Sequence, residues 1–351
     1  MNRPRNEYDV AKALAIALVV LGHYFDPFTW FPIGSYQLAL FFFLSGLLFS
    51  PRHLDAKGAY LAGRAKRLLL TYFLYNFAFA VLTFAVSRSI GIWKDIDCFS
   101  PRNLFVEPFL TGHQYPFFNA GWFLPALFIV QAVFLFLWRP AARMPKAVLL
   151  CLLAGLASLA PLLGTLGLTW GGWLILGRTA MGLSFYCLGH LFRDFSQTRD
   201  VFCPAGCFLC LGVNIFMTVN GIPFTYNMVF NQYFGAAPAV IAGSLSGVYM
   251  ALYMSKALAR NISPRNPLFL VSDNTLHIMS LHLLVFFILN YCLLSYYGYP
   301  LSLLENIYMP SKPNIYYPVF VLAGLFLPAL AVHGVKKALA RLTPSAPSGK
   351  S

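Results

Sequence analysis

Apolar segments of about 20 residues recur along almost the whole chain, and this recurrence is the feature that most constrains its fold. A helix of that length and polarity matches the hydrocarbon thickness of a bilayer and satisfies its own backbone hydrogen bonds there. Only 10% of the residues are charged, whereas soluble domains carry about a quarter, so the chain cannot cover a water-facing surface in the usual way. The sequence therefore predicts an all-α, polytopic integral membrane protein.

We predict about ten transmembrane helices, at residues 8–25, 33–50, 68–87, 119–138, 147–164, 173–192, 201–219, 233–256, 275–297 and 316–334. An even number of helices places both termini on one side of the membrane. Most of the 25 Lys and Arg residues fall on that side, and the loops of the opposite side contain only Arg88, Lys94, Arg102 and Lys312. The positive-inside rule then predicts cytoplasmic termini. The net charge of +14 reflects this asymmetry and indicates contact with anionic lipid headgroups rather than nucleic acid.

Lys12 and His23 lie on one stripe of the first predicted helix. At 100° per residue their separation brings them within about 20° of the same face, roughly 16 Å apart along the axis. Asp9 and Asp26 flank the stripe at three-residue offsets. Ionisable groups inside a membrane are costly and usually functional, so Lys12 indicates an anion site and His23 a reactive group. A histidine that only packs and hydrogen-bonds against a neighbouring helix is the alternative.

Three arginines are further candidates. Arg64 and Arg67 are i,i+3 neighbours at the start of the third predicted helix, where they can present two guanidinium groups to a phosphate. The positive-inside rule alone is the simpler explanation for that pair. Arg178 lies well inside a later predicted helix and needs a partner, a watery cavity or a route to the outer interface. We expect it to hold a polar acceptor or a pyrophosphate.

The ninth predicted helix carries two histidines. Thr275 and His282 are seven residues apart and share a face, whereas His277 points about 140° away from His282. We therefore interpret His282 as the residue that lines a cavity and His277 as structural. No metal site is expected, because the nearest candidate, a group of three cysteines at positions 203, 207 and 210, has no histidine or carboxylate beside it.

These residues together resemble the acyltransferase-3 family, which comprises membrane O-acyltransferases of bacterial surface sugars. The resemblance runs from about residue 5 to 335 and rests on motifs that occur in the family's order: Asp9-x-x-Lys12, His23, Phe41-Phe-Phe-Leu-Ser45-Gly46, Arg64-x-x-Arg67, Trp122-Phe-Leu-Pro and Thr275 with His282. The most similar subgroup is the fucose-4-O-acetylase-like and nodulation-factor acetyltransferase-like set. The chain departs from it at Gln37-Leu-Ala-Leu40, where His-Met-Pro is usual. We expect one acyltransferase-3-like domain over residues 1–340 and a disordered tail over 341–351.

The resemblance implies a multi-pass enzyme of the bacterial inner membrane that moves an acyl group, most simply acetyl, from acyl-CoA to a carbohydrate hydroxyl. The acceptor would be a surface polysaccharide or its lipid-linked precursor, with no permanently bound cofactor. Lys12, Arg64 and Arg67 would hold the phosphates of coenzyme A, and the roughly 16 Å from Lys12 to His23 is comparable to an extended pantetheine arm. An exporter or assembly partner for a polysaccharide is the alternative function.

The resemblance also implies roles around the reacting atoms. His23 would act as the general base on the sugar hydroxyl, or as a nucleophile that carries the acyl group. Asp26 would orient His23, His282 would line the site, and Arg178 or Ser45 would stabilise the developing oxyanion.

Overall fold

The computed structural model describes residues 5–24, 30–198, 201–308 and 314–342. This part of the chain is helical apart from one short strand pair, in agreement with the all-α prediction. The α-helices are α1 (Glu7–Gly22), α2 (Gln37–Leu47), α3 (Lys57–Arg64), α4 (Thr71–Ile90), α5 (Glu107–Leu110), α6 (Phe123–Ala141), α7 (Lys146–Thr165), α8 (Gly171–Thr198), α9 (Pro204–Val219), α10 (Ala237–Ala259), α11 (Leu268–Asp273), α12 (Thr275–Tyr297) and α13 (Tyr317–Leu342). The antiparallel strands are β1 (Tyr226–Asn227) and β2 (Gln232–Tyr233).

Each of the ten segments predicted to span the membrane overlaps one of these helices. Among the described residues, six helices are long and apolar enough to cross a membrane: Lys57–Ile90, Phe123–Ala141, Lys146–Thr165, Ala237–Ala259, Thr275–Tyr297 and Tyr317–Ala338. The helices in the other four predicted segments do not meet this criterion over their described residues. Helix α2, for example, has 11 residues and rises only about 16 Å, which is roughly half of a bilayer core. The chain is therefore a multi-pass membrane protein, and both the number of ten spans and the side of the termini stay predictions.

The outward faces of the long helices carry apolar side chains. On α4 the exposed large residues recur every three or four positions, which is the spacing of one helical face: Leu74, Phe77, Val81 and Phe84. A stripe of this kind on the outside of the molecule suits contact with lipid. The predicted tail, 341–351, lies outside the described residues except for its first two positions, which end α13.

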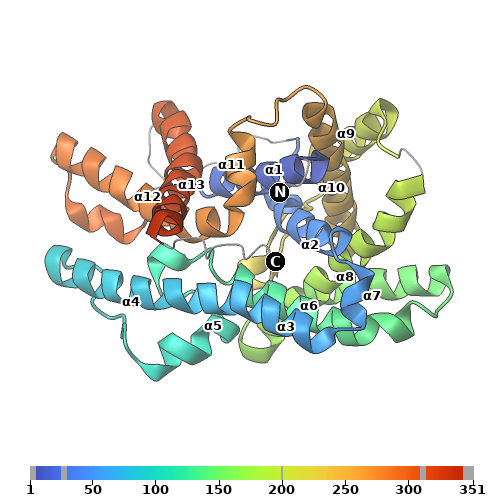
Figure 1. Cartoon of the computed structure of the whole chain (residues 1–351), viewed down its shortest axis with the longest axis horizontal. Helices are drawn as coiled ribbons and strands as arrows, with labels where there is room; N and C mark the ends of the chain where they lie inside the picture. The colour runs from blue at the N-terminus through green and yellow to red at the C-terminus, as the bar shows by residue number, and fades with distance from the viewer. Residues whose placement is uncertain (1–4, 25–29, 199–200, 309–313, 343–351) are drawn as a thin grey trace, which may run out of the picture.

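Helix α1 lies at the centre of the molecule and contacts α2, α10, α11, α12 and α13 (Figure 1). Many of its buried residues are small, including Ala11, Ala13 and Ala15, and small side chains let neighbouring helices approach closely. The helix begins with a capping box: the Asn6 side chain accepts from the Asp9 amide, and the Asp9 carboxylate accepts from the Asn6 amide. This cap fixes the end of α1 that carries Lys12.

Helices α2 and α8 pack backbone against backbone. A Cβ atom added to Gly46 of α2 would lie 1.9 Å from the Tyr186 carbonyl oxygen, and one added to Gly189 of α8 would lie 2.0 Å from the Phe43 carbonyl oxygen. No side chain fits at either contact, so both positions need glycine. The close packing positions α2, whose residues Phe41 and Ser45 face the cavity described next.

Candidate functional site

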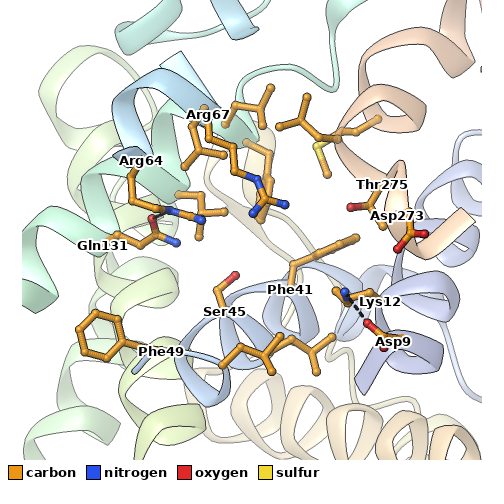
Figure 2. Close-up of a pocket in the computed structure, with 18 of the residues that line it drawn as sticks. Asp9, Lys12, Phe41, Ser45, Phe49, Arg64, Arg67, Gln131, Asp273 and Thr275 are labelled. Atoms are coloured by element: carbon orange, nitrogen blue, oxygen red, sulfur yellow. Dashed lines mark hydrogen bonds and ion pairs between the residues drawn. The ribbon is translucent and has the colours of Figure 1, made fainter. Parts of the chain in front are cut away.

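A cavity of about 740 Å³ opens between α1, α2, the helix that joins α3 to α4, α6, and the junction of α11 with α12. We call it the basic cavity, because its charged lining comprises four cations and two acids: Arg5, Lys12, Arg64, Arg67, Asp9 and Asp273. In Figure 2 the two arginines at 64 and 67 face Lys12 across the cavity, and the α2 residues Phe41 and Ser45 lie between them. The structure thus brings together all three residues predicted to bind phosphate.

Lys12 is held in the basic cavity by a buried acid. Its Nζ lies 2.8 Å from Oδ1 of Asp9, a residue that is only 1% exposed. Asp9 therefore has two roles, since the same carboxylate caps α1. A buried carboxylate is costly without a cationic partner, so this pair limits the positions that the Lys12 ammonium can take.

Arg64 and Arg67 lie at an irregularity in a long helix. The helix runs continuously from Lys57 to Ile90, and residues Ala65–Leu70 form a π-helical segment, η3, within it. Such segments are rare and occur often at functional sites, because they change which residues share a face. Arg64 Nε donates to Gln131 Oε1 at 2.6 Å, which fixes its guanidinium against α6. Both arginines line the basic cavity.

A second cavity, of about 380 Å³, lies at the other end of α1. We call it the histidine cavity; its described lining includes His23, Gln37, His113, Asn119, Trp122, Tyr226, Asn227, Phe230 and Tyr308. His23 is the C-cap residue of α1, and its ring stacks on Tyr308 with 5.8 Å between centroids and 15° between planes. The predicted stripe of α1 therefore has one functional group in each cavity, with Lys12 in the first and His23 in the second.

His23 and His282 form a pair whose tautomers follow from their partners. His282 Nδ1 lies 2.8 Å from the Ile278 carbonyl oxygen, and His23 Nδ1 lies 2.8 Å from that of Val19. A carbonyl oxygen only accepts, so each Nδ1 carries the hydrogen. His282 Nε2 is then an acceptor, and it lies 3.3 Å from His23 Nδ1. The same arrangement leaves the lone pair of His23 on Nε2, the atom that a general base needs free.

Phe123 and Met279 line both cavities. Phe123 is 3% exposed and packs against Phe41 and Phe42 of α2, with ring centroids 5.5 and 5.0 Å apart. Met279 is 5% exposed and lies on α12, one turn before His282. These two apolar side chains therefore form part of the partition between the basic cavity and the histidine cavity.

Arg178 lies outside the lining of both cavities. Its guanidinium donates to the carbonyl oxygens of Thr111 (3.1 Å), Met228 and Val229, and it stacks on the Trp122 ring at 4.4 Å. Those carbonyls belong to a loop and a turn that carry part of the wall of the histidine cavity. The contacts of Arg178 are thus those of a residue that ties these segments together, and its predicted oxyanion role stays a prediction.

The remaining candidate residues lie in different places. Asp26 lies outside the described residues. Ser45 lines the basic cavity and not the histidine cavity. His277 shares a 2.9 Å hydrogen bond with the Tyr75 hydroxyl and lines neither cavity. His282, which was predicted to line a cavity, also lines neither, because it is fully buried behind His23.

Several lining residues of the histidine cavity were not singled out in the sequence. Asn119, Asn227 and Tyr308 are polar or aromatic residues that lie outside the α-helices, and no spacing rule connects them with His23. Gln37 was noted only as the start of the segment that departs from the subgroup pattern. His113 lies in the long loop before α6. The signal available for it was a lone histidine among aromatic residues in an otherwise apolar chain.

Comparison with known proteins gives one match. The model of the acyltransferase domain that defines the acyltransferase-3 family matches residues 5–333, nearly the whole chain. No curated protein and no solved structure matches the chain. The matched range includes both cavities.

Proposed function

The chain belongs to the acyltransferase-3 family, and from this premise we propose that it is a membrane O-acetyltransferase acting on a sugar hydroxyl of a bacterial surface polysaccharide or its lipid-linked precursor. The donor would be acetyl-CoA. The observation that carries the proposal is the placement of a set of cations suited to phosphate and a base-competent histidine in two cavities that share Phe123 and Met279 in their linings.

The basic cavity suits the donor. Coenzyme A carries several phosphate charges, and guanidinium groups bind phosphate oxygens through paired hydrogen bonds. Arg64 and Arg67 approach from one wall and Lys12 from the other. The volume of about 740 Å³ lies within the range of small-molecule sites. With cytoplasmic termini, as the basic residues predict, this cavity would face the cytoplasmic pool of acyl-CoA.

The histidine cavity suits the transfer itself. His23 Nε2 would take the proton from the acceptor hydroxyl as the oxygen attacks the thioester carbonyl carbon. The tetrahedral intermediate would then collapse with cleavage of the carbon–sulfur bond, and the proton held by His23 would pass to the departing thiolate. His282 would keep His23 in the tautomer that leaves Nε2 free, because its own Nε2 accepts from His23 Nδ1.

NMR of purified surface polysaccharide tests the proposal. The strains are one that lacks the gene and the same strain complemented with wild type, His23→Ala or His333→Ala, the last being a matched control because His333 is exposed and lines neither cavity. We expect base-labile O-acetyl signals with wild type and His333→Ala only. If the polysaccharide were equally acetylated in every strain but less abundant at the surface without the gene, the acetyltransferase proposal would be wrong. The result would favour an exporter.

A further inference from the structure

The histidine cavity contains buried polar atoms without partners. Neither ring nitrogen of His113 forms a hydrogen bond with the described residues, and the same holds for Oε1 of Gln37. Asn119 and the Val229 backbone lie near the His113 ring, but neither meets the geometry of a hydrogen bond with it. Both His113 and Gln37 line the histidine cavity.

Unpaired buried polar atoms are costly, and native structures retain few of them. Each one needs an explanation, such as a ligand that completes its hydrogen bonds. Here the unpaired atoms of two residues from different parts of the chain lie on one cavity, which also contains His23. A ligand in that cavity would satisfy them together.

Aromatic rings form the apolar part of the same walls: Trp122, Tyr226, Phe230 and Tyr308. The His113 ring lies 5.0 Å from that of Phe230, and the His23 ring is stacked on Tyr308. Flat apolar surfaces beside amide and imidazole groups match a sugar ring, which has C–H faces and hydroxyl edges. A simple aliphatic alcohol has one hydroxyl and offers no flat ring face to the aromatic walls, so it matches this lining less well than a sugar.

The charge of the lining restricts the chemical class of the ligand further. Among the described residues that line the histidine cavity none is Asp, Glu, Lys or Arg, in contrast to the basic cavity. The guanidinium of Arg178, which lies behind part of the cavity wall, is already engaged by Trp122 and three backbone carbonyls. A charged acceptor would lose its hydration here without gaining a partner of opposite charge.

We infer that His113 and Gln37 bind the acceptor, and that the sugar residue they bind is uncharged. This inference rests on the proposed acetyl transfer and specifies its acceptor. A hydroxyl group both donates and accepts, so it pairs with a neutral imidazole, which offers one nitrogen of each kind, and with an amide. Burial and the nearby Arg178 lower the pKa of His113 to about 4, which keeps the ring neutral at physiological pH.

Two measurements on the same variants test this inference. The polysaccharide NMR described above identifies which sugar residue carries the acetyl group, and calorimetry with purified protein in detergent measures the affinity for coenzyme A. The variants are His113→Phe, His113→Gln and Gln37→Leu, with His333→Phe as the matched control. We expect the acetyl group on a neutral sugar residue. In His113→Phe and Gln37→Leu, acetylation should be lower than in wild type by about tenfold or more. His113→Gln should retain more activity than His113→Phe, and coenzyme A affinity should stay unchanged in all four variants.

The outcomes separate the two claims. Acetylation of a uronic or other charged residue by wild type would overturn the inference and leave the acetyltransferase intact. Normal acetylation with both His113→Phe and Gln37→Leu would also overturn it. Absence of acetylation in the wild-type strain would instead contradict the proposed function. Retained coenzyme A binding excludes misfolding as the cause of any loss.

Discussion

His282 Nε2 lies 3.3 Å from His23 Nδ1, although 259 positions separate the two residues in the chain. The pair joins the end of α1 to the buried side of α12, where His282 is fully buried. Two carbonyl oxygens, those of Val19 and Ile278, fix both tautomers. The consequence is a His23 ring with its free lone pair on Nε2, and this arrangement can be tested directly.

We predict that His282 acts through the position and tautomer of His23. His282→Phe leaves the Val19 carbonyl oxygen as an acceptor for His23 Nδ1 but removes the second one, and it should lower kcat about 10- to 100-fold while the KM for acetyl-CoA changes little. His282→Gln can restore an acceptor through its amide oxygen and should recover part of kcat. Steady-state kinetics of the purified variants measure kcat and KM separately. A wild-type kcat in His282→Phe would contradict the prediction.

The cations of the basic cavity should determine donor affinity. Arg64→Ala and Arg67→Ala should each weaken coenzyme A binding by about tenfold or more, because each removes charge-assisted hydrogen bonds to phosphate. Lys12→Arg should keep most of the affinity, and Lys12→Ala should not. Calorimetry measures these affinities, with the exposed Arg260→Ala as control. Lys12→Ala also removes the lysine partner of the buried Asp9, so the double variant with Asp9→Asn distinguishes a loss of binding from a loss of stability. Unchanged affinity in all the alanine variants would contradict the prediction that these cations bind the phosphates of coenzyme A.

The partition between the cavities should limit the size of the acyl group. Phe123→Leu and Met279→Ala widen the only apolar barrier that both cavities share among the described residues. The ratio of kcat/KM for butyryl-CoA to that for acetyl-CoA should rise about tenfold, the effect of a few methylene groups of space. Phe128→Leu, on the same helix but in neither lining, is the control. An unchanged ratio in both variants would show that the acyl group takes another route.

Arg178 should be needed for stability more than for chemistry. Arg178→Met would leave the carbonyls of Thr111, Met228 and Val229 without their donor, at a cost of about 1–3 kcal/mol for each group that water does not reach. We expect a lower thermal midpoint and a lower yield of folded protein. Thermal unfolding in detergent measures the midpoint. A variant with wild-type stability and no activity would favour the predicted oxyanion role instead.

The buried His113 should make the protein less stable in acid. Its pKa falls from 6.5 to about 4 on folding, first because of burial and then because of Arg178, so between these values the unfolded chain binds more protons. The free energy of unfolding should therefore decrease as the pH falls from about 6.5 to about 4. Thermal midpoints across this range should decrease less in His113→Gln, which has no group that titrates there. Parallel curves for the two proteins would contradict this contribution.

Local periodicity explains what could be predicted along single helices. The 100° step of an α-helix aligned Lys12 with His23 and separated His277 from His282. In the structure Lys12 and His23 line the two cavities and His277 forms a hydrogen bond with Tyr75, but His282 is fully buried against His23 and lines neither cavity. The arginines at 64 and 67 also face the basic cavity, although their helix contains a π-helical segment that the sequence did not indicate. Helix ends were less predictable: α2 is much shorter than its predicted range, 33–50.

By itself the sequence determined the class of protein and the residues worth testing, because hydrophobicity and helical periodicity are local properties of the chain. Only the tertiary structure decided which of those residues meet. It paired His23 with His282, turned Arg178 toward backbone carbonyls, and placed His113 and Gln37 with unpaired atoms on one cavity. The physical reason is that faces toward lipid and faces toward other helices are both apolar, so the pattern of hydrophobicity does not encode which helices pack together.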